Sequence, residues 1–349
     1  MALRIGKKQS TPQPMEEKRM TMFKSLKRAS SAIALATCVA FPAASLAQNL
    51  TLRISGENPM TGFDLQMAER FAQNLEATLG DAFDHELFHT AALGNEEVHM
   101  QMIRTGQIDV YPMGSDAVSL DSKWAVFDMP FLFSDRETVA RLLDGEVGQA
   151  LRESMRASAG LEVLAFGELG FRVITNNVRP INVPADLSGV KLRVPGSAAR
   201  ILAFETFGAQ PVSMNMGELY LGLQQGTVDG QENPLVAIKN RSFFEVQKYL
   251  SISRHVYSPV TLVMNAAKYD SLTDDQRTAV KAAAQEAAEY TREMGTAADD
   301  ALLGDLGAGM EVNDIDLAAF KEASVPIWEA VGAMAGADFA AQVVAAASN

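Results

Sequence analysis

The chain has 349 residues, long enough to bury a large core, and this length suggests two domains. Hydrophobic residues make up 48% and charged residues 21%, proportions that are ordinary for a soluble globular protein. The formal net charge of −13 disfavours nucleic acid and anionic membranes as partners. After residue 50, no apolar run reaches the ~18 residues that are needed to cross a bilayer.

The N-terminus has the pattern of a secretory signal. Basic residues precede an apolar stretch over residues 32–46, and small Ser45 and Ala47 occupy the −3 and −1 positions of a cleavage site. A transmembrane anchor is the alternative, but ~15 apolar residues are too few for it. We therefore predict export to the periplasm and cleavage after Ala47.

Removal of the leader, residues 1–47, makes the net charge of the exported chain more negative. It holds 8 of the 30 basic and 2 of the 43 acidic residues, so the exported chain has a net charge near −19. Met20 and Met22 are alternative starts. Cys38, the only cysteine, lies inside the leader and could be a lipidation site, although Thr37 before it is larger than the usual small residue. Without its leader the chain has neither a thiol nor a disulfide.

The first half alternates strand and helix patterns. Strands are predicted over 50–55, 82–89 and 108–113, and amphipathic helices over 63–79 and 95–104. This βαβαβ order indicates a mainly parallel sheet flanked by helices. In such sheets, ligands bind beyond the carboxyl ends of the strands.

A second series of elements begins near Leu161. Residues 163–168 and 170–176 are strand-like and interrupted by glycine. Further strands are predicted near 190–195, 209–214, 227–230 and 260–265, with helices over 198–208 and 217–225. From Thr273 a long alanine-rich helix follows, with Thr273 and Gln276 as a capping box. If it runs to Leu303 it is ~45 Å long and could brace two lobes.

Several segments between Gly170 and Asn265 resemble the DctP-type binding proteins of TRAP (tripartite ATP-independent periplasmic) transporters. DGQENP, residues 229–234, is the most specific of these segments. The others are LSGVKLRVPG (187–196), GAQPVSM (208–214), ELYLGLQQGTVDGQENPL (218–235) and FFEVQKYLSISRH (243–255), with TGQIDV (105–110) and FDMPFLF (127–133) earlier in the chain.

The resemblance implies an α/β fold of two lobes, each a mainly parallel sheet flanked by helices, with a long helix spanning both. Lobe I would comprise residues 48–169 and 259–298, and lobe II residues 170–258 and 299–349. It also implies a binding protein rather than an enzyme, a monomer without a cofactor. Its ligand would be a small organic acid, such as a dicarboxylate or a sugar acid, delivered to the membrane subunits of the transporter.

Three residues match positions at which this family holds the ligand carboxylate. Arg193 lies on the strand face opposite Leu192 and Val194, and its planar guanidinium suits a carboxylate. Arg172 matches a second arginine, with the alternative that it pairs with a buried acid. Asn233 matches an amide that contacts the carboxylate, with the alternative that its Asn-Pro step only forms a turn.

Other residues of these blocks differ from the family pattern or belong to its framework. Met216, a further candidate for ligand contact, stands where several relatives have an aromatic ring, and Gly196 where they often have a polar residue. Arg200 is an additional base, which we expect on a helix surface. Gln231 and Glu232 are expected to be framework residues.

Four polar residues follow strands of the first half. Glu57 and Asn58 come after the first strand, and Ser115 and Asp116 after the third. Their place at strand ends makes them candidates for binding the hydroxyls or a second polar group of the ligand. The alternative is ordinary loop polarity.

His85-Glu86-Leu87-Phe88-His89 is a literal HExxH sequence, which on a helix would bind zinc in a secreted metalloprotease. Its flanks predict a strand instead, where residues four apart lie about 13 Å from each other. We therefore predict no metal site here. A binding protein of an ABC transporter is a further alternative that would share the two lobes but lacks the DGQENP segment. His255 is predicted to be structural.

Overall fold

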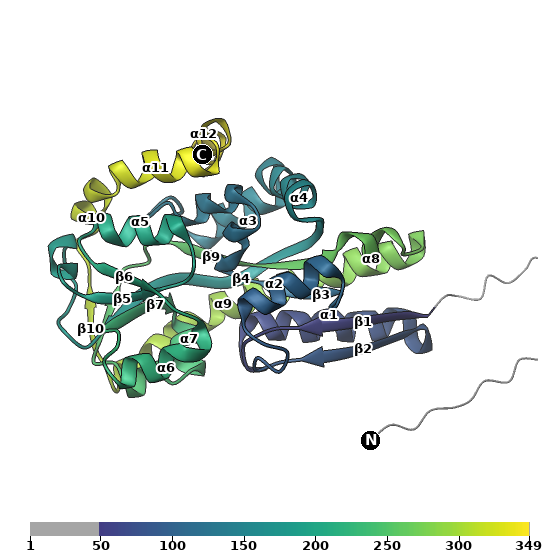
Figure 1. Ribbon diagram of the computed structural model, residues 1–349, viewed down its shortest axis with the longest axis horizontal. Coiled ribbons are helices and arrows are strands. Elements are labelled where there is room, and N and C mark those ends of the chain that lie inside the picture. The colour runs from purple at the N-terminus through teal and green to yellow at the C-terminus, as the bar shows by residue number, and fades with distance from the viewer. Residues whose placement is uncertain (1–48, 349) are drawn as a thin grey trace, which may run out of the picture. The chain divides into compact units, whose positions relative to one another are not determined.

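The computed structural model describes residues 49–348 (Figure 1). The predicted leader and its cleavage site lie outside the described residues, so they stay predictions. The strands are β1 (Leu50–Ser55), β2 (Phe83–Phe88), β3 (Val110–Met113), β4 (Leu161–Asn176), β5 (Lys191–Val194), β6 (Gln210–Ser213), β7 (Gly230–Pro234), β8 (Tyr249–Ile252), β9 (Tyr257–Asn265) and β10 (Glu311–Asp314).

Twelve α-helices are found among residues 49–348. They are α1 (Phe63–Leu79), α2 (Glu96–Thr105), α3 (Arg136–Asp144), α4 (Glu146–Ala159), α5 (Ala198–Thr206), α6 (Met216–Gln224), α7 (Leu235–Asn240), α8 (Ala266–Asp270), α9 (Asp274–Gly307), α10 (Leu317–Ala323), α11 (Val325–Ala335) and α12 (Ala337–Ala347).

Two parallel strand triplets with the same internal order make up the ends of the sheet. In the first triplet β1 lies between β2 and β3, and in the second β5 lies between β6 and β7. Most of these strands are followed directly by an α-helix, as β1 is by α1 and β5 by α5, which confirms the predicted alternation of strands and helices. Figure 1 shows the first triplet in purple and blue and the second in teal.

Antiparallel strands connect the triplets, so the complete sheet is mixed. β9 pairs with β3 and with the first part of β4, while the last residues of β4 pair with β7 and β8. The two strand-like segments around Gly170 are therefore one strand of 16 residues, not two. Gly170 has φ +109°, a conformation open to glycine, and the register of β4 against β9 shifts at this point.

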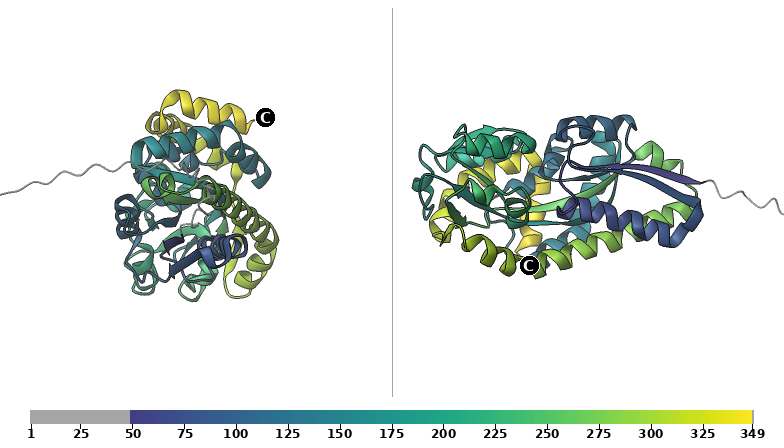
Figure 2. Two further views of the ribbon diagram at one scale, coloured as in Figure 1. Left: turned by 90° about the vertical axis from the view of Figure 1, so that its right-hand side faces the viewer. Right: turned by 90° about the horizontal axis from the view of Figure 1, so that it is seen from below.

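The long helix α9 begins as predicted. Thr273 accepts a hydrogen bond from the backbone of Gln276, whose side chain accepts one from Thr273 N at 3.0 Å, a capping box. Its 34 residues give a length of roughly 51 Å. It packs on α1 and β4 and also on α7, so it contacts elements next to both triplets (Figure 2).

The predicted lobe boundaries near residues 169 and 259 fall inside β4 and β9. Both are continuous strands, and α12 packs against α3, an element from the other predicted lobe. The boundaries stay a prediction.

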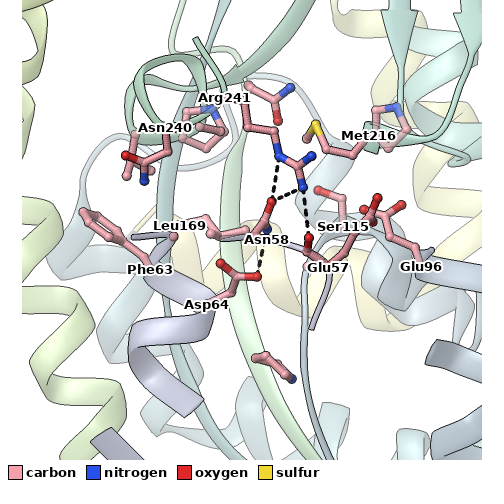
Figure 3. A pocket seen from close by; sticks show the side chains of 18 of the residues that line it. Glu57, Asn58, Phe63, Asp64, Glu96, Ser115, Leu169, Met216, Asn240 and Arg241 are labelled. Atoms are coloured by element: carbon pink, nitrogen blue, oxygen red, sulfur yellow. Dashed lines mark hydrogen bonds between the residues drawn. The ribbon is translucent and has the colours of Figure 1, made fainter. Parts of the chain in front are cut away.

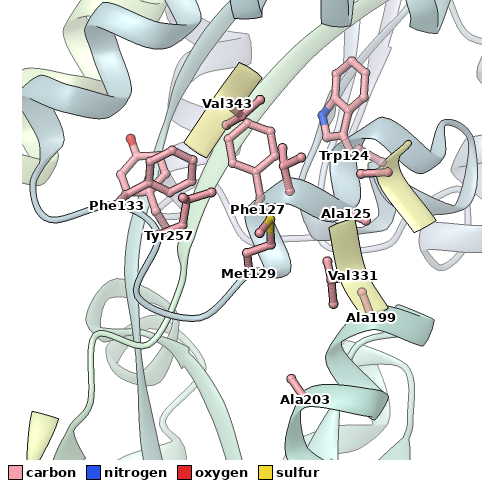
Figure 4. Close-up of a cluster of buried hydrophobic side chains, with 14 of the residues drawn as sticks. Trp124, Ala125, Phe127, Met129, Phe133, Ala199, Ala203, Tyr257, Val331 and Val343 are labelled. Carbon is pink, nitrogen blue, oxygen red and sulfur yellow. The ribbon is translucent and has the colours of Figure 1, made fainter. Parts of the chain in front are cut away.

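Buried apolar side chains from distant parts of the chain fill the space beside the sheet. In one cluster, residues from the loop before α3 meet α5, β9, α11 and α12 (Figure 4). The Trp124 Nε1 in this cluster donates to Thr261 Oγ1 at 3.3 Å, and Trp328 Nε1 donates to Pro130 O at 2.8 Å. Both tryptophans thus hold elements of the core together.

The HExxH sequence lies on strand β2, as predicted. His85 is paired in the ladder with Leu52 of β1, and His89 follows the end of the strand. Residues 49–348 contain no group of three or more His, Cys, Asp or Glu side chains placed to hold a metal ion. Within the same range, no helix combines the length and the apolar character of a membrane span.

Candidate functional site

A pocket lies where the carboxyl ends of the two strand triplets face each other (Figure 3). The first triplet contributes the residues after β1 and β3, and the second contributes residues of β5 and β7. All eight residues predicted to bind ligand line this pocket, namely Glu57, Asn58, Ser115, Asp116, Arg172, Arg193, Met216 and Asn233. The structure therefore brings together side chains that are up to 176 positions apart in the sequence.

Arg193 reaches the pocket from β5 and is 1% exposed. Its Nε donates to Met214 O at 2.8 Å, which fixes the guanidinium plane. Its buried Nη1 has no hydrogen-bond partner among the described residues. Burial lowers the pKa of Arg193 to about 10, so the group is still a cation at neutral pH. A fixed, buried cation with an unsatisfied donor is suited to an anion.

Arg172 is bound to a buried acid, which is the alternative considered for it above. Its Nη2 donates to Glu232 Oε1 at 2.8 Å and to Asn233 Oδ1 at 3.0 Å. Its Nη1 has only a long contact of 3.4 Å with Ser258 Oγ. Arg172 also lines the pocket, so a ligand contact through Nη1 stays a prediction.

Glu232 is the centre of a buried ionic network. Besides Arg172, it accepts from Arg200 Nη1 at 2.7 Å, and His255 Nε2 lies 3.1 Å away. Burial alone would raise the pKa of Glu232, but the charges of Arg172 and Arg200 outweigh it and hold the pKa well below its usual range. The predicted framework role of Glu232 and the structural role of His255 are confirmed.

The expectation that Arg200 lies on a helix surface is wrong. Arg200 is 1% exposed, and its Nε donates to Asp128 Oδ1 at 3.0 Å in addition to its bond with Glu232. The inward face of α5 carries Arg200 toward two acids that are 72 and 32 positions away. Nothing local in the sequence indicates these partners.

The first triplet supplies acidic side chains to the pocket. Glu57 is 6% exposed; its Oε1 accepts from Gly217 N at 3.2 Å, and its Oε2 has no partner among the described residues. Burial, followed by the nearby Glu96 carboxylate, raises the pKa of Glu57 to about 7. Asp116 accepts from Tyr111 Oη at 3.0 Å.

Contacts between residues 57–64 and α6 and α7 close one side of the pocket. Arg241 Nε donates to Asn58 Oδ1 at 3.0 Å, and Asn58 Nδ2 donates to Asp64 Oδ2 at 2.8 Å, as Figure 3 shows. Asn240 Nδ2 donates to Thr61 O at 2.7 Å. We name this set of contacts the Arg241 latch.

Sequence reasoning missed several lining residues. Arg241 lies just after a short helix and Glu96 at the start of α2, where an acid is commonly explained by the helix dipole. Asp64, in the first turn of α1, has the same explanation. Only the three-dimensional structure shows that these side chains face one pocket.

Residues 55–334 match the family described as bacterial extracellular solute-binding protein, family 7, also called DctP. The chain belongs to this family. The 2,3-diketo-L-gulonate-binding periplasmic protein YiaO of Escherichia coli (strain K12) is 37% identical over 301 residues, which cover 85% of this chain and 91% of YiaO.

Solved structures of TRAP periplasmic solute-binding proteins have the same fold. The protein from Polaromonas sp. JS666, bound to D-erythronate, has a TM-score of 0.80 and 32% identity and covers 84% of this chain and 98% of its own. The sugar acid binding protein DctPAm of Advenella mimigardefordensis, in complex with galactonate, has a TM-score of 0.82 and 28% identity, covering 86% and 98%. The two-lobed α/β fold expected from the sequence is thereby confirmed, and the family consists of solute-binding proteins of transporters.

Proposed function

We propose that this chain captures a small organic acid in the pocket between its strand triplets and delivers it to the membrane subunits of a TRAP transporter. The observation that carries this proposal is Arg193, a buried cation whose Nη1 lacks a partner inside the pocket. The relatives described above bind sugar acids, which supports a carboxylate as the group that meets Arg193.

The other polar groups of the second triplet complete a carboxylate site. Asn233 accepts from Arg172, and its Nδ2 donates to Gln231 Oε1 at 2.6 Å, which leaves a second N–H of the same amide for a ligand oxygen. Arg172 also lines this pocket, and its Nη1 makes only one long contact, with Ser258 Oγ at 3.4 Å. Three donors around one anion would satisfy its oxygens after water is excluded.

A thermal-shift screen over aldonates, uronates, keto acids and dicarboxylates tests this function. A ligand at 100 times its Kd should stabilise the protein by ~2.7 kcal/mol. The Arg193→Ala variant should lose the shift with the same ligand, whereas Arg104→Ala, an exposed arginine at the end of α2, should keep it. A ligand that stabilises both variants equally would place the carboxylate site elsewhere.

We further propose that the chain works in the periplasm as a monomer after cleavage at Ala47. The family membership supports the location, and the composition of the leader supports the cleavage site. Intact mass and light scattering of protein from a periplasmic extract test this. A mass that retains residues 20–47, or a stable dimer, would contradict it.

A further inference from the structure

The two walls of the pocket carry different ionisable side chains, acidic on one and basic on the other. Residues after the first triplet and on α2 supply Glu57, Glu96 and Asp116, whereas the second triplet supplies Arg172 and Arg193. Figure 3 shows Glu57 and Glu96 side by side on one side of the pocket. A ligand that places its carboxylate on the arginines must therefore extend its other end toward carboxylates.

Glu57 is the residue of this acidic wall that is built to meet a ligand. It is buried and lines the pocket, Gly217 N fixes its Oε1, and its Oε2 has no partner among the described residues. A buried acceptor without a donor is unfavourable, so the ligand should supply a hydroxyl there. A second carboxylate has no proton to donate and would meet a like charge.

Arg241, the third arginine that lines the pocket, does not offset the acidic side chains around Glu57. Arg241 donates to Asn58 Oδ1 and to the main-chain oxygen of Glu57, which holds its guanidinium in the latch. Glu57 is thus faced by Glu96 from α2, Arg193 from β5 and Arg241 after α7, and both arginines are cations at neutral pH.

We propose that Glu57, with Glu96 beside it, makes the protein selective for hydroxylated monocarboxylates and against dicarboxylates. This inference rests on the proposed function, because it takes Arg193 as the place of the first carboxylate. It assigns the distal end of the ligand a hydroxyl group that donates to Glu57 Oε2. Glu57 is then a specificity-determining residue on the side of the pocket formed by the residues after β1.

Matched pairs of sugar acids test the proposal. An aldonate and the aldarate of the same configuration differ only at the distal carbon, which carries a hydroxymethyl group in one and a carboxylate in the other. Suitable probes are erythronate with meso-tartrate, gluconate with glucarate, and galactonate with galactarate. Titration calorimetry at pH 8.0, where Glu57 is mostly ionised, gives the affinity ratio for each pair that binds.

We expect wild-type protein to bind the aldonate roughly 100-fold more tightly than the aldarate, because like charges across a desolvated contact repel strongly. Glu57→Gln keeps an acceptor for Gly217 N and removes the charge, so the ratio should fall about tenfold or more. Glu97→Gln, one position along α2 from Glu96 and exposed, is the matched control and should leave the ratio unchanged.

The outcomes separate this inference from the proposed function. Two results would overturn the selectivity and leave the organic-acid function intact. One is aldarate binding that depends on Arg193 and is as tight as aldonate binding. The other is an aldonate-to-aldarate affinity ratio that Glu57→Gln leaves unchanged. Aldarate binding that disappears in Arg241→Gln would also overturn it, because the second carboxylate would then lie on the latch. Acid binding that is indifferent to Arg193→Ala would overturn both.

Discussion

Glu232 and Arg172 form a buried ion pair in which Arg172 Nη2 lies 2.8 Å from Glu232 Oε1. Arg172 uses Nε and Nη2 for this acid, which leaves Nη1 with a single long contact to Ser258 Oγ. The orientation of an arginine in the candidate binding site is therefore fixed by a carboxylate that no ligand can reach, since Glu232 is fully buried. The same acid also holds Arg200, so one side chain organises two cations.

Replacing Glu232 should lower the free energy of unfolding. Glu232→Gln leaves two buried arginines short of a charge partner, and we expect the free energy of unfolding to fall by ~3–5 kcal/mol. Urea denaturation at pH 7 measures this. Glu205→Gln, an exposed acid on α5, should change it by less than ~0.5 kcal/mol. Equal stability of the two variants would contradict a central role for Glu232.

Acidification should remove the stabilisation that Glu232 provides through its ion pairs with Arg172 and Arg200. The pKa of Glu232 is depressed below its ordinary value of 4.5, so its stabilisation is fully present above about pH 5 and is lost as the pH falls toward the depressed value. Wild-type protein should lose stability on acidification below pH 5 more steeply than Glu232→Gln. Parallel pH profiles of the two proteins would refute the assignment.

Glu57 should make the protein less stable as the pH rises, the opposite of the effect of Glu232. Its pKa is raised from 4.5 to about 7, so the folded state binds the extra proton and stability falls as the pH rises between these values. At about 1.4 kcal/mol per unit, the loss amounts to about 3 kcal/mol without ligand. The ionisable groups that face Glu57 are Glu96, Arg193 and Arg241. Asp64 and Asp116 also have raised pKa values.

Glu57→Gln should therefore flatten the fall in melting temperature between pH 5 and pH 7, while Glu97→Gln should not. The remaining slope would belong to Asp64 and Asp116. A wild-type profile that rises over this range, or one that Glu57→Gln leaves unaltered, would show that Glu57 is ionised throughout.

Arg193 should dominate affinity for the ligand. Arg193→Ala leaves a buried carboxylate without its partner, a loss of ~3–5 kcal/mol, which corresponds to about two to three and a half orders of magnitude in Kd. Arg193→Lys should recover only part of this, because an ammonium lacks the planar fork of a guanidinium. Calorimetry checks both variants, with Arg104→Ala as the surface control. Affinity within a few-fold of wild type for Arg193→Ala would refute the site.

The Arg241 latch should govern the release of the ligand. Arg241→Gln removes charge-assisted hydrogen bonds to Asn58, each worth about 1.5–3 kcal/mol, so the dissociation rate should rise about 10- to 100-fold. The association rate should change little. Stopped-flow kinetics measures both rates, and small-angle scattering should show a larger radius of gyration for the variant at saturating ligand. Unaltered dissociation would mean that other contacts hold the pocket closed.

The sequence predicted the elements that depend on local patterns. The apolar periodicity of residues 63–79 and the capping box at Thr273 produced helices with the expected starts. Arg193 lies in the pocket, as the family resemblance and its position near the end of a strand predicted. In each case the interactions that determine the structure lie within a few residues of one another, so the local sequence pattern predicts it.

Features that depend on distant residues were missed or wrong. Arg200 was expected on a helix surface because its neighbours along α5 say nothing about Asp128 or Glu232. The glycine at position 170 was interpreted as a break, although its positive φ continues the strand through a register shift against β9. Glu57 was named as a candidate, but the closeness of Glu96, which raises its pKa, depends on how α2 packs.

Strand β4 has a consequence for how the protein can be divided. Its first residues are hydrogen-bonded to β9 and its last residues to β7 and β8, so a single strand belongs to the hydrogen-bond ladders on both sides of the pocket. Neither side can be expressed alone by cutting the chain once, because each takes strands from separate stretches of sequence. Heat should melt the molecule in one cooperative transition, and a cut within β4 should abolish folding of both sides together.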